Sequence, residues 1–207
     1  MKSDAKSEHW SDVYGSKADT DTSWYEPVPA ASLAMLDRLN VGAGQSVIDV
    51  GGGTSALVGS LWARGHRDLS VLDVSAEALQ RSRGRLGEDA DRVDWVVADV
   101  TDWTPTRQYD VWHDRAVFHF MTTPNARAAY LATLRSTLRP GGALVLATFA
   151  LTGPEQCSGL PVARYSAEGL VDVLGPGIEL IDHREVVHTT PWGSEQPFTW
   201  IGGRLTP

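Results

Sequence analysis

The sequence is poor in residues that form covalent or metal cross-links. Its 207 residues include a single cysteine, Cys157. One cysteine excludes an internal disulfide and a cysteine-rich zinc site. His113 and Asp114 are adjacent, but no further ligands follow them at a recognisable spacing, so we expect no bound metal.

Long apolar runs are also missing. No stretch approaches the roughly 20 apolar residues that cross a bilayer. The first residues, MKSDAKSEHWSD, hold neither an apolar core nor a small-residue cleavage site of the kind that marks exported proteins. These absences predict a cytoplasmic protein without a membrane partner.

Positive charge is scarce. Lysine occurs only at Lys2, Lys6 and Lys17, and 18 lysines and arginines stand against 26 aspartates and glutamates, a net charge of -8. Proteins that bind the phosphate backbone of nucleic acids need a concentrated basic surface. The composition therefore argues against nucleic acid as a partner.

Short apolar runs alternate with stretches of helical periodicity through most of the chain. The sequence has no internal repeat and no linker-like composition, so residues 1–207 are predicted to form a single domain. Strands are expected at 46–50, 69–74, 93–100, 109–113 and 143–150. Helices are expected at 33–39, 55–64, 76–86, 124–138 and 166–174. Apolar strands separated by helices indicate a doubly wound α/β fold, a Rossmann-like parallel sheet covered on both faces.

The C-terminal part departs from this alternation. Residues 178–188 and 197–205 have the pattern of strands, and the turn-rich TTPWGSEQ that joins them leaves no room for a crossover helix. Neighbouring strands joined so closely run antiparallel. The sequence therefore predicts a mostly parallel seven-stranded sheet that ends in an antiparallel hairpin.

The stretch VIDVGGGTSAL, residues 47–57, fits two cofactor patterns. It suits a dinucleotide site and equally a loop that holds S-adenosylmethionine, because both use glycines with positive φ and the N-terminus of a helix. Asp73 and Asp99 end the next two strands, where they can meet a ribose and an adenine, although each alone is explained equally well as a helix cap. Asp49 would repel a pyrophosphate but not an ammonium or sulfonium group. Together these residues favour S-adenosylmethionine.

With these residues the chain resembles the class I S-adenosylmethionine-dependent methyltransferases. The resemblance rests on VIDVGGGTS, VLDVS, VVADV, YDVWHDRAVFHFM and LRPGGALVLATF, and the closing hairpin agrees with the seven-stranded sheet of that family. It implies that Asp73 holds the ribose, that Asp99 meets the adenine and that His113 lies near the methionine moiety. The loop of the family often ends in glycine where this chain has Ser55, which can cap the helix instead. The implied cofactor-binding residues are Asp49, Val50, Gly51, Gly52, Gly53, Ser55, Asp73, Val74, Asp99, Val100 and His113.

The segment HDRAVFHF, after the fourth strand, holds the catalytic candidates. Methyl transfer depends mainly on alignment of the nucleophile with the methyl group and the sulfur, and it needs a base only when the nucleophile must lose a proton. His119 is our candidate base, although packing in the loop explains it equally well, and His113 is a second catalytic candidate. The segment lacks the Asn/Asp-Pro-Pro-aromatic pattern typical of enzymes that methylate planar exocyclic amines, which argues against adenine, cytosine or glutamine acceptors.

Two other segments are expected to border the methyl acceptor. The long turn-rich stretch 152–166 follows the fifth strand, and loops of that length in compact domains are often functional. Residues 1–26 are polar, turn-rich and aromatic, and residues 27–207 are expected to form the core of the domain. We interpret residues 1–26 as a lid that closes over the crevice and excludes water, or else as a segment that is simply anchored to the core. Cys157 is interpreted as a wall residue and not as a nucleophile. The expected acceptor contacts are Trp24, Tyr25, Arg115, Phe118, Cys157, Arg164, Tyr165 and His188.

The sequence as a whole predicts an enzyme that moves a methyl group from S-adenosylmethionine to an N, O or S nucleophile of a small molecule, leaving S-adenosylhomocysteine. The SWY stretch and the serine at the end of the cofactor loop are similar to lysine methyltransferases of translation elongation factors, so a protein lysine is the alternative acceptor. A cofactor-binding protein without catalysis and a nicotinamide oxidoreductase are the remaining alternatives.

Overall fold

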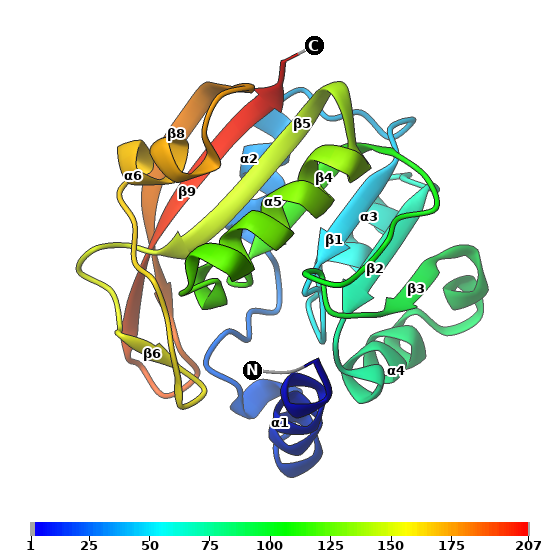
Figure 1. Cartoon of the computed structure of the whole chain (residues 1–207). Coiled ribbons are helices and arrows are strands. Elements are labelled where there is room, and N and C mark those ends of the chain that lie inside the picture. Colours follow the sequence, from blue (N-terminus) through cyan, green and yellow to red (C-terminus); the bar gives the residue numbers. More distant parts are fainter. Residues whose placement is uncertain (1–2, 207) are drawn as a thin grey trace.

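A seven-stranded sheet forms the centre of the computed structural model, which describes residues 3–206 (Figure 1). The strands lie in the order β3-β2-β1-β4-β5-β9-β8. The first five are parallel, and β9 runs antiparallel to both β5 and β8. Their bounds are β1 Val47–Val50, β2 Leu69–Asp73, β3 Asp94–Val97, β4 Tyr109–Arg115, β5 Leu138–Phe149, β8 Ile178–Thr189 and β9 Glu195–Leu205. The predicted fold class, including the antiparallel hairpin, is thereby confirmed.

Helices cover both faces of the sheet because the central strands are buried on both sides. One apolar core joins the sheet to the helices α2 Ala30–Arg38, α3 Leu57–Ala63 and α4 Ala76–Leu86. The core on the opposite face joins it to α5 Pro124–Thr137 and α6 Ala167–Leu174. Within the described residues, no helix combines the length and the apolar character that crossing a membrane requires.

The order of the strands determines where a ligand can bind. From β1 the chain proceeds outward through β2 and β3, then returns to place β4 on the other side of β1. In open α/β sheets the crevice beyond the carboxyl ends of the strands, at such a reversal, receives the ligand. Asp49 on β1 and Asp73 at the end of β2 belong to the two strands on one side of this reversal, and His113 belongs to β4 on the other.

The N-terminal segment differs from its prediction. It was expected to be turn-rich, but Ser3–Ser16 form the helix α1, followed by a 3-10 turn at Asp19–Asp21. The sequence of α1 has no continuous apolar face, so contacts with the rest of the protein hold it in place. The ring of Tyr14 is buried, and Nη2 of Arg81 on α4 donates a hydrogen bond of 2.5 Å to the Tyr14 carbonyl. Figure 1 shows α1 beyond the carboxyl ends of β1 and β2.

Candidate active site

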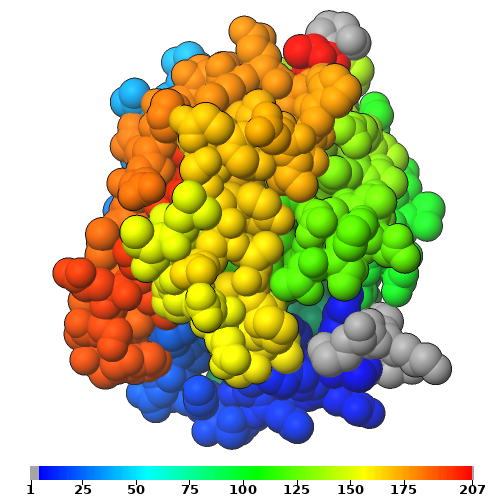
Figure 2. Space-filling model, turned by 60° about the vertical axis from the view of Figure 1, so that its left-hand side comes forward, coloured from blue at the N-terminus to red at the C-terminus, as the bar shows by residue number. Residues whose placement is uncertain are grey.

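A cavity of about 630 Å³ lies beyond the carboxyl ends of β1, β2 and β4. Its walls come from the strand ends, from α1 and the segment that follows it, and from the short strands β6 Gln156–Cys157 and β7 Leu160–Pro161. In the space-filling view the blue N-terminal segment meets the yellow segment after β5 along the lower part of the molecule (Figure 2). The cavity is therefore bounded by segments that are distant in sequence.

The glycine loop is shaped by its own packing as much as by a ligand. Gly51 has φ +66°, and a Cβ atom there would lie 1.9 Å from Cγ2 of Val117. A Cβ atom on Gly52 would lie 2.5 Å from Cγ1 of Val71 and 2.7 Å from Oδ2 of Asp49. Gly51 and Gly52 line the cavity, whereas Gly53, a predicted cofactor contact, is not among the lining residues. A Cβ atom on Gly53 would lie 2.5 Å from the Tyr14 hydroxyl oxygen, so this glycine makes room for α1.

Asp49 offers a carboxylate oxygen that no residue of the described chain satisfies. Its Oδ1 lies 2.7 Å from Nδ1 of His113, and Nε2 of that ring lies 2.9 Å from Oγ of Ser32. Its Oδ2 is buried without a hydrogen-bond partner and belongs to a residue that lines the cavity. A buried carboxylate oxygen without a donor is costly, and the ammonium group of a methionine moiety would satisfy it. This part of the cavity therefore fits S-adenosylmethionine.

His113 lines the cavity and contacts Asp49, and its placement gives no support to the predicted catalytic role as a base. Both of its ring nitrogens are occupied by Asp49 and Ser32, and the side chain is buried. Among residues 3–206, no three histidine, cysteine, aspartate or glutamate side chains are grouped to hold a metal ion. His113 is best described as a residue that positions the Asp49 carboxylate.

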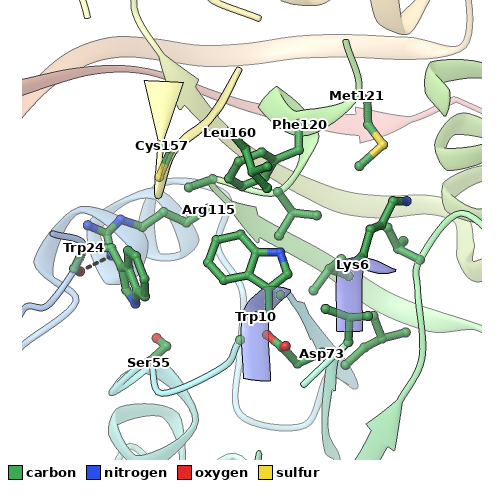
Figure 3. Close-up of a pocket in the computed structure, with 18 of the residues that line it drawn as sticks. Lys6, Trp10, Trp24, Ser55, Asp73, Arg115, Phe120, Met121, Cys157 and Leu160 are labelled. Carbon is green, nitrogen blue, oxygen red and sulfur yellow. Dashed lines mark hydrogen bonds between the residues drawn. The ribbon is translucent and has the colours of Figure 1, made fainter. Parts of the chain in front are cut away.

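Asp73 lies at the end of β2 with its carboxyl group buried and facing the same cavity (Figure 3). Its Oδ1 accepts a hydrogen bond of 2.8 Å from the amide of Ser75. Burial raises the pKa of Asp73 to about 7, and the nearby Asp49 carboxylate contributes in the same direction. A ribose hydroxyl donating to this group would replace part of the lost hydration and stabilise its charged form.

Asp99 also reaches the cavity, but it already has a cationic partner. Nζ of Lys6 on α1 lies 2.5 Å from its Oδ2, while the amide and hydroxyl of Thr101 bind its Oδ1 at 3.0 and 2.8 Å. Although burial alone would raise the pKa of Asp99, the bonds from Lys6 and Thr101 lower it overall. The ion pair between Lys6 and Asp99 fixes α1 over the end of the cavity where the sequence predicts the adenine.

His119 does not reach the cavity, so its placement gives no support to the predicted role as a base. Its ring is fully buried against Phe120 and Phe149, with centroids at 4.5 and 4.8 Å. Neither ring nitrogen has a hydrogen-bond partner among the described residues. Burial lowers the pKa of His119 to about 3, which leaves the ring neutral at physiological pH. The loop-packing alternative fits this environment.

We expect His119→Phe to preserve turnover and to leave stability unchanged or raise it by about 1 kcal/mol, because an apolar ring of similar volume replaces a buried ring with two unbonded nitrogens. Methyl transfer and urea unfolding would be measured together. A loss of turnover at unchanged stability and unchanged affinity for S-adenosylhomocysteine would contradict this expectation and support His119 as a catalytic base.

The structure separates the eight expected acceptor contacts into two groups. Four of them line the cavity, namely Trp24, Tyr25, Arg115 and Cys157. The other four are held elsewhere by packing or hydrogen bonds and are not among the lining residues: Phe118 and Tyr165 pack together, Arg164 pairs with Glu155, and His188 lies 2.7 Å from the Ser23 carbonyl oxygen. Their placement gives no support to a direct contact with the acceptor.

Several lining residues were not predicted as acceptor contacts. Lys6, Trp10 and Tyr14 come from α1, and Glu26 follows in the same N-terminal segment. The aromatic residues of this segment could have indicated that it lines the cavity, since they are the basis of the lid hypothesis. The lining residues Phe120, Phe149 and Phe198 carry no such signal, because in the sequence they read as ordinary apolar residues of a loop and two strands.

Aromatic rings and one ion pair form another part of the cavity wall. The Trp10 ring contacts those of Trp24 and Phe120, with centroids at 5.8 and 5.4 Å. Arg115 forms an ion pair with Glu26, with 2.9 Å between Nη1 and Oε1. Burial raises the pKa of Glu26 and lowers that of Arg115, each shift being opposed by the partner's charge. This region suits a flat organic molecule with few charges.

Cys157 lies in the same wall as a buried thiol. Burial raises its pKa to about 11, although Ser158 and Arg115 oppose that shift. A thiol with so high a pKa is almost entirely protonated at neutral pH and is a poor nucleophile. The environment therefore fits the sequence interpretation of Cys157 as a wall residue.

Comparison with known proteins agrees with this geometry. Residues 47–142 match a family described as a methyltransferase domain. The chain is 29% identical over 119 residues to a trans-aconitate 2-methyltransferase of Azoarcus sp., and this match covers 56% of the chain but only 44% of that relative. It is 21% identical over 177 residues to an EEF1A lysine methyltransferase 2 of Danio rerio, covering 82% and 70% of the two chains.

A solved structure supports the fold. It is that of a Burkholderia thailandensis 1,6-didemethyltoxoflavin-N1-methyltransferase with bound 1,6-didemethyltoxoflavin and S-adenosylhomocysteine. The two chains superimpose with a TM-score of 0.69 at 21% identity, over 98% of this chain and 85% of the other. Residues 47–142 thus match a methyltransferase domain, and the chain as a whole shares the fold of a solved methyltransferase. The predicted fold is thereby confirmed, and the match over residues 47–142 supports the methyltransferase family predicted from the sequence.

Proposed function

We propose that the protein transfers a methyl group from S-adenosylmethionine to an N, O or S nucleophile of a small molecule enclosed in this cavity. The observation that carries the proposal is the convergence of three acidic side chains on one cavity, with Oδ2 of Asp49 buried and without a donor. A cationic methionine moiety would satisfy that oxygen, and a dinucleotide phosphate would be repelled by it.

Each strand end has a role in holding the cofactor. Asp49, positioned by His113, would bind the ammonium group, and Asp73 would accept from the ribose hydroxyls. Asp99 and Val100 would border the adenine beside Lys6. When bound, the cofactor supplies an electrophilic methyl group on a sulfonium. The contribution of the protein is then alignment of the nucleophile and exclusion of water.

Partial cover of the cavity by the N-terminal segment and by β6 and β7 favours a small acceptor over a protein. Trp10 and Trp24 contact each other, and they line the same cavity as Cys157 of β6 and Leu160 and Pro161 of β7. A lysine on a folded protein would need an open channel for its side chain, whereas a small molecule can be surrounded once α1 is in place. We therefore prefer the small-molecule acceptor and keep the protein lysine as the alternative, which the 21% identity to the EEF1A lysine methyltransferase favours.

Two measurements test this function. Calorimetry should show binding of S-adenosylhomocysteine and no binding of NADH. Radiolabelled S-adenosylmethionine would then be supplied with a cell lysate fractionated by size, and label is expected in the small-molecule fraction. Label confined to protein would support the lysine alternative, and binding of NADH alone would overturn the methyltransferase function.

Two aspartate variants distinguish a specific loss of cofactor binding from general damage to the protein. Asp49→Asn preserves shape but removes the charge that would meet the ammonium group, so affinity for S-adenosylhomocysteine should fall by about 10- to 100-fold. Asp68→Asn changes an acid that lies just before β2, at the opposite end of the strands, and pairs with Arg107. It should leave the affinity unchanged.

A further inference from the structure

Arg115 is the most unusual polar group in the acceptor region of the cavity. Only 13% of its side chain is exposed, and the guanidinium lies 5.5 Å from the ring centroid of Phe198. Figure 3 shows it reaching toward Trp24, with Cys157 above it and Trp10 across the cavity. A largely buried guanidinium normally has partners for most of its donors.

The polar contacts of Arg115 with the described residues, one hydrogen bond and one ion pair, involve one end of the guanidinium. Nη1 donates to the Trp24 carbonyl at 3.1 Å and also lies 2.9 Å from Oε1 of Glu26. Arginine and carboxylate groups often pair through two parallel hydrogen bonds, but here only Nη1 approaches Glu26, and Oε1 of Glu26 has no hydrogen-bond partner among the described residues. Among residues 3–206, Nε and Nη2 of Arg115 have no partner. Since Arg115 lines the cavity, these donors are available to a molecule inside it.

The charge of the cavity limits which oxygen can bind there. Its lining includes the five acidic residues Glu26, Asp49, Asp73, Asp99 and Asp102, against the two cations Lys6 and Arg115. Glu26 already balances Arg115 at close range. An acceptor carrying a carboxylate would meet the excess negative charge, whereas a neutral carbonyl oxygen accepts hydrogen bonds without that repulsion. The surrounding rings of Trp10, Trp24 and Phe198 favour a flat framework.

We propose that the methyl acceptor is a flat, uncharged molecule whose carbonyl oxygen binds the free Nε and Nη2 donors of Arg115, with Glu26 and the Trp24 carbonyl orienting the guanidinium. This inference rests on the proposed function, because it names the substrate class of the same site. Arg115 thereby determines specificity, and Glu26 acts through Arg115 as a positioning residue.

The test uses the full chain saturated with S-adenosylhomocysteine and three probes of similar size: 2-quinolone, which has a neutral ring carbonyl, naphthalene-2-carboxylate and 2-naphthylamine. Saturation-transfer NMR would measure their binding. The wild-type protein should bind 2-quinolone most tightly. Arg115→Met should weaken that binding at least 10-fold, as expected for the loss of hydrogen bonds from a charged donor.

Two further variants keep the test decisive. Arg139→Met removes an arginine at the opposite end of the sheet, where it pairs with Asp110, and should leave the binding of every probe unchanged. Glu26→Gln retains the guanidinium but removes the charge that balances it, so preference should shift toward naphthalene-2-carboxylate. This second prediction remains testable if Arg115→Met does not fold.

Tighter binding of naphthalene-2-carboxylate or 2-naphthylamine than of 2-quinolone by the wild-type protein would overturn the inference. Equal binding of 2-quinolone by the wild-type protein and a folded Arg115→Met variant would do the same, as would failure of all three probes to bind. Failure of S-adenosylhomocysteine itself to bind is a separate result. That outcome would contradict the proposed function and not the substrate class alone.

Discussion

Replacing Gly51 by alanine is expected to lower the free energy of unfolding by about 2–5 kcal/mol. Gly51 has φ +66°, a conformation that costs an L-residue about 1–2 kcal/mol. In addition, the new Cβ atom would lie 1.9 Å from Cγ2 of Val117, so the loop after β4 would have to move. Such overpacking typically costs a further 1–3 kcal/mol. Urea unfolding would measure the sum.

The chain offers a matched control for this substitution. Gly59 lies inside α3, and a Cβ atom there would have no atom within 4 Å apart from its chain neighbours and the backbone of its own helix. Gly59→Ala should stabilise the protein by about 0.5–1 kcal/mol, because alanine favours a helix interior. If both variants proved equally stable, the close approach of Gly51 to Val117 would not be a real constraint on the loop.

Gly51→Ala should also disturb the cofactor site. Its amide donates a hydrogen bond of 2.7 Å to the Leu72 carbonyl, which ties the loop to the end of β2 beside Asp73. Movement of this loop would change the distance between Asp49 and Asp73. We therefore expect weaker binding of S-adenosylhomocysteine even where the variant remains folded.

The sheet and the cofactor residues could be predicted because local pattern and chain order determine them. Continuous apolar strands separated by helices require a parallel sheet covered on both faces. Because the strands are parallel, Asp73 and Asp99 lie at the same edge of the sheet, beyond the carboxyl ends of the strands, whatever the conformation of the loops. The short connection between residues 189 and 195 likewise requires β8 and β9 to be antiparallel.

Long-range contacts account for what the sequence did not predict. The helix α1 depends on contacts of Lys6 with Asp99 and of Tyr14 with the backbone at Gly53, and neither pairing has a local signal. His119 illustrates the same limit. A histidine in a loop is equally consistent with a base or with packing, and only its burial against Phe120 and Phe149 distinguishes the two.

Replacing Asp73 by asparagine is expected to weaken binding of S-adenosylhomocysteine by about 10- to 100-fold at pH 8, because the ribose would lose a charged hydrogen-bond acceptor. The loss should shrink as the pH falls. Burial raises the pKa of Asp73 to about 7, so below that pH the wild-type side chain is itself protonated and accepts the ribose hydroxyls less well. Calorimetry at pH 5.5 and 8 would measure both proteins.

The effect of Asp73 on stability should have the opposite pH dependence to its effect on ligand affinity. Between about pH 4 and 7 the folded protein holds a proton on Asp73 that the unfolded chain has released. The stabilisation is complete below pH 4 and is lost as the pH rises to about 7, by about 1.4 kcal/mol per pH unit. Wild-type protein should therefore lose stability relative to Asp73→Asn over this interval when urea unfolding is followed without ligand.

Comparison of the two proteins isolates Asp73 from the other buried acid. Burial also raises the pKa of Asp114 to about 7, but that group is present in both proteins and its effect cancels in the difference. Opposite pH trends in ligand affinity and in stability would mean that the Asp73 proton is held by the folded protein alone and released when ligand binds. Parallel trends, or a stability difference independent of pH, would show that Asp73 is already ionised in the folded protein and that burial does not control its charge.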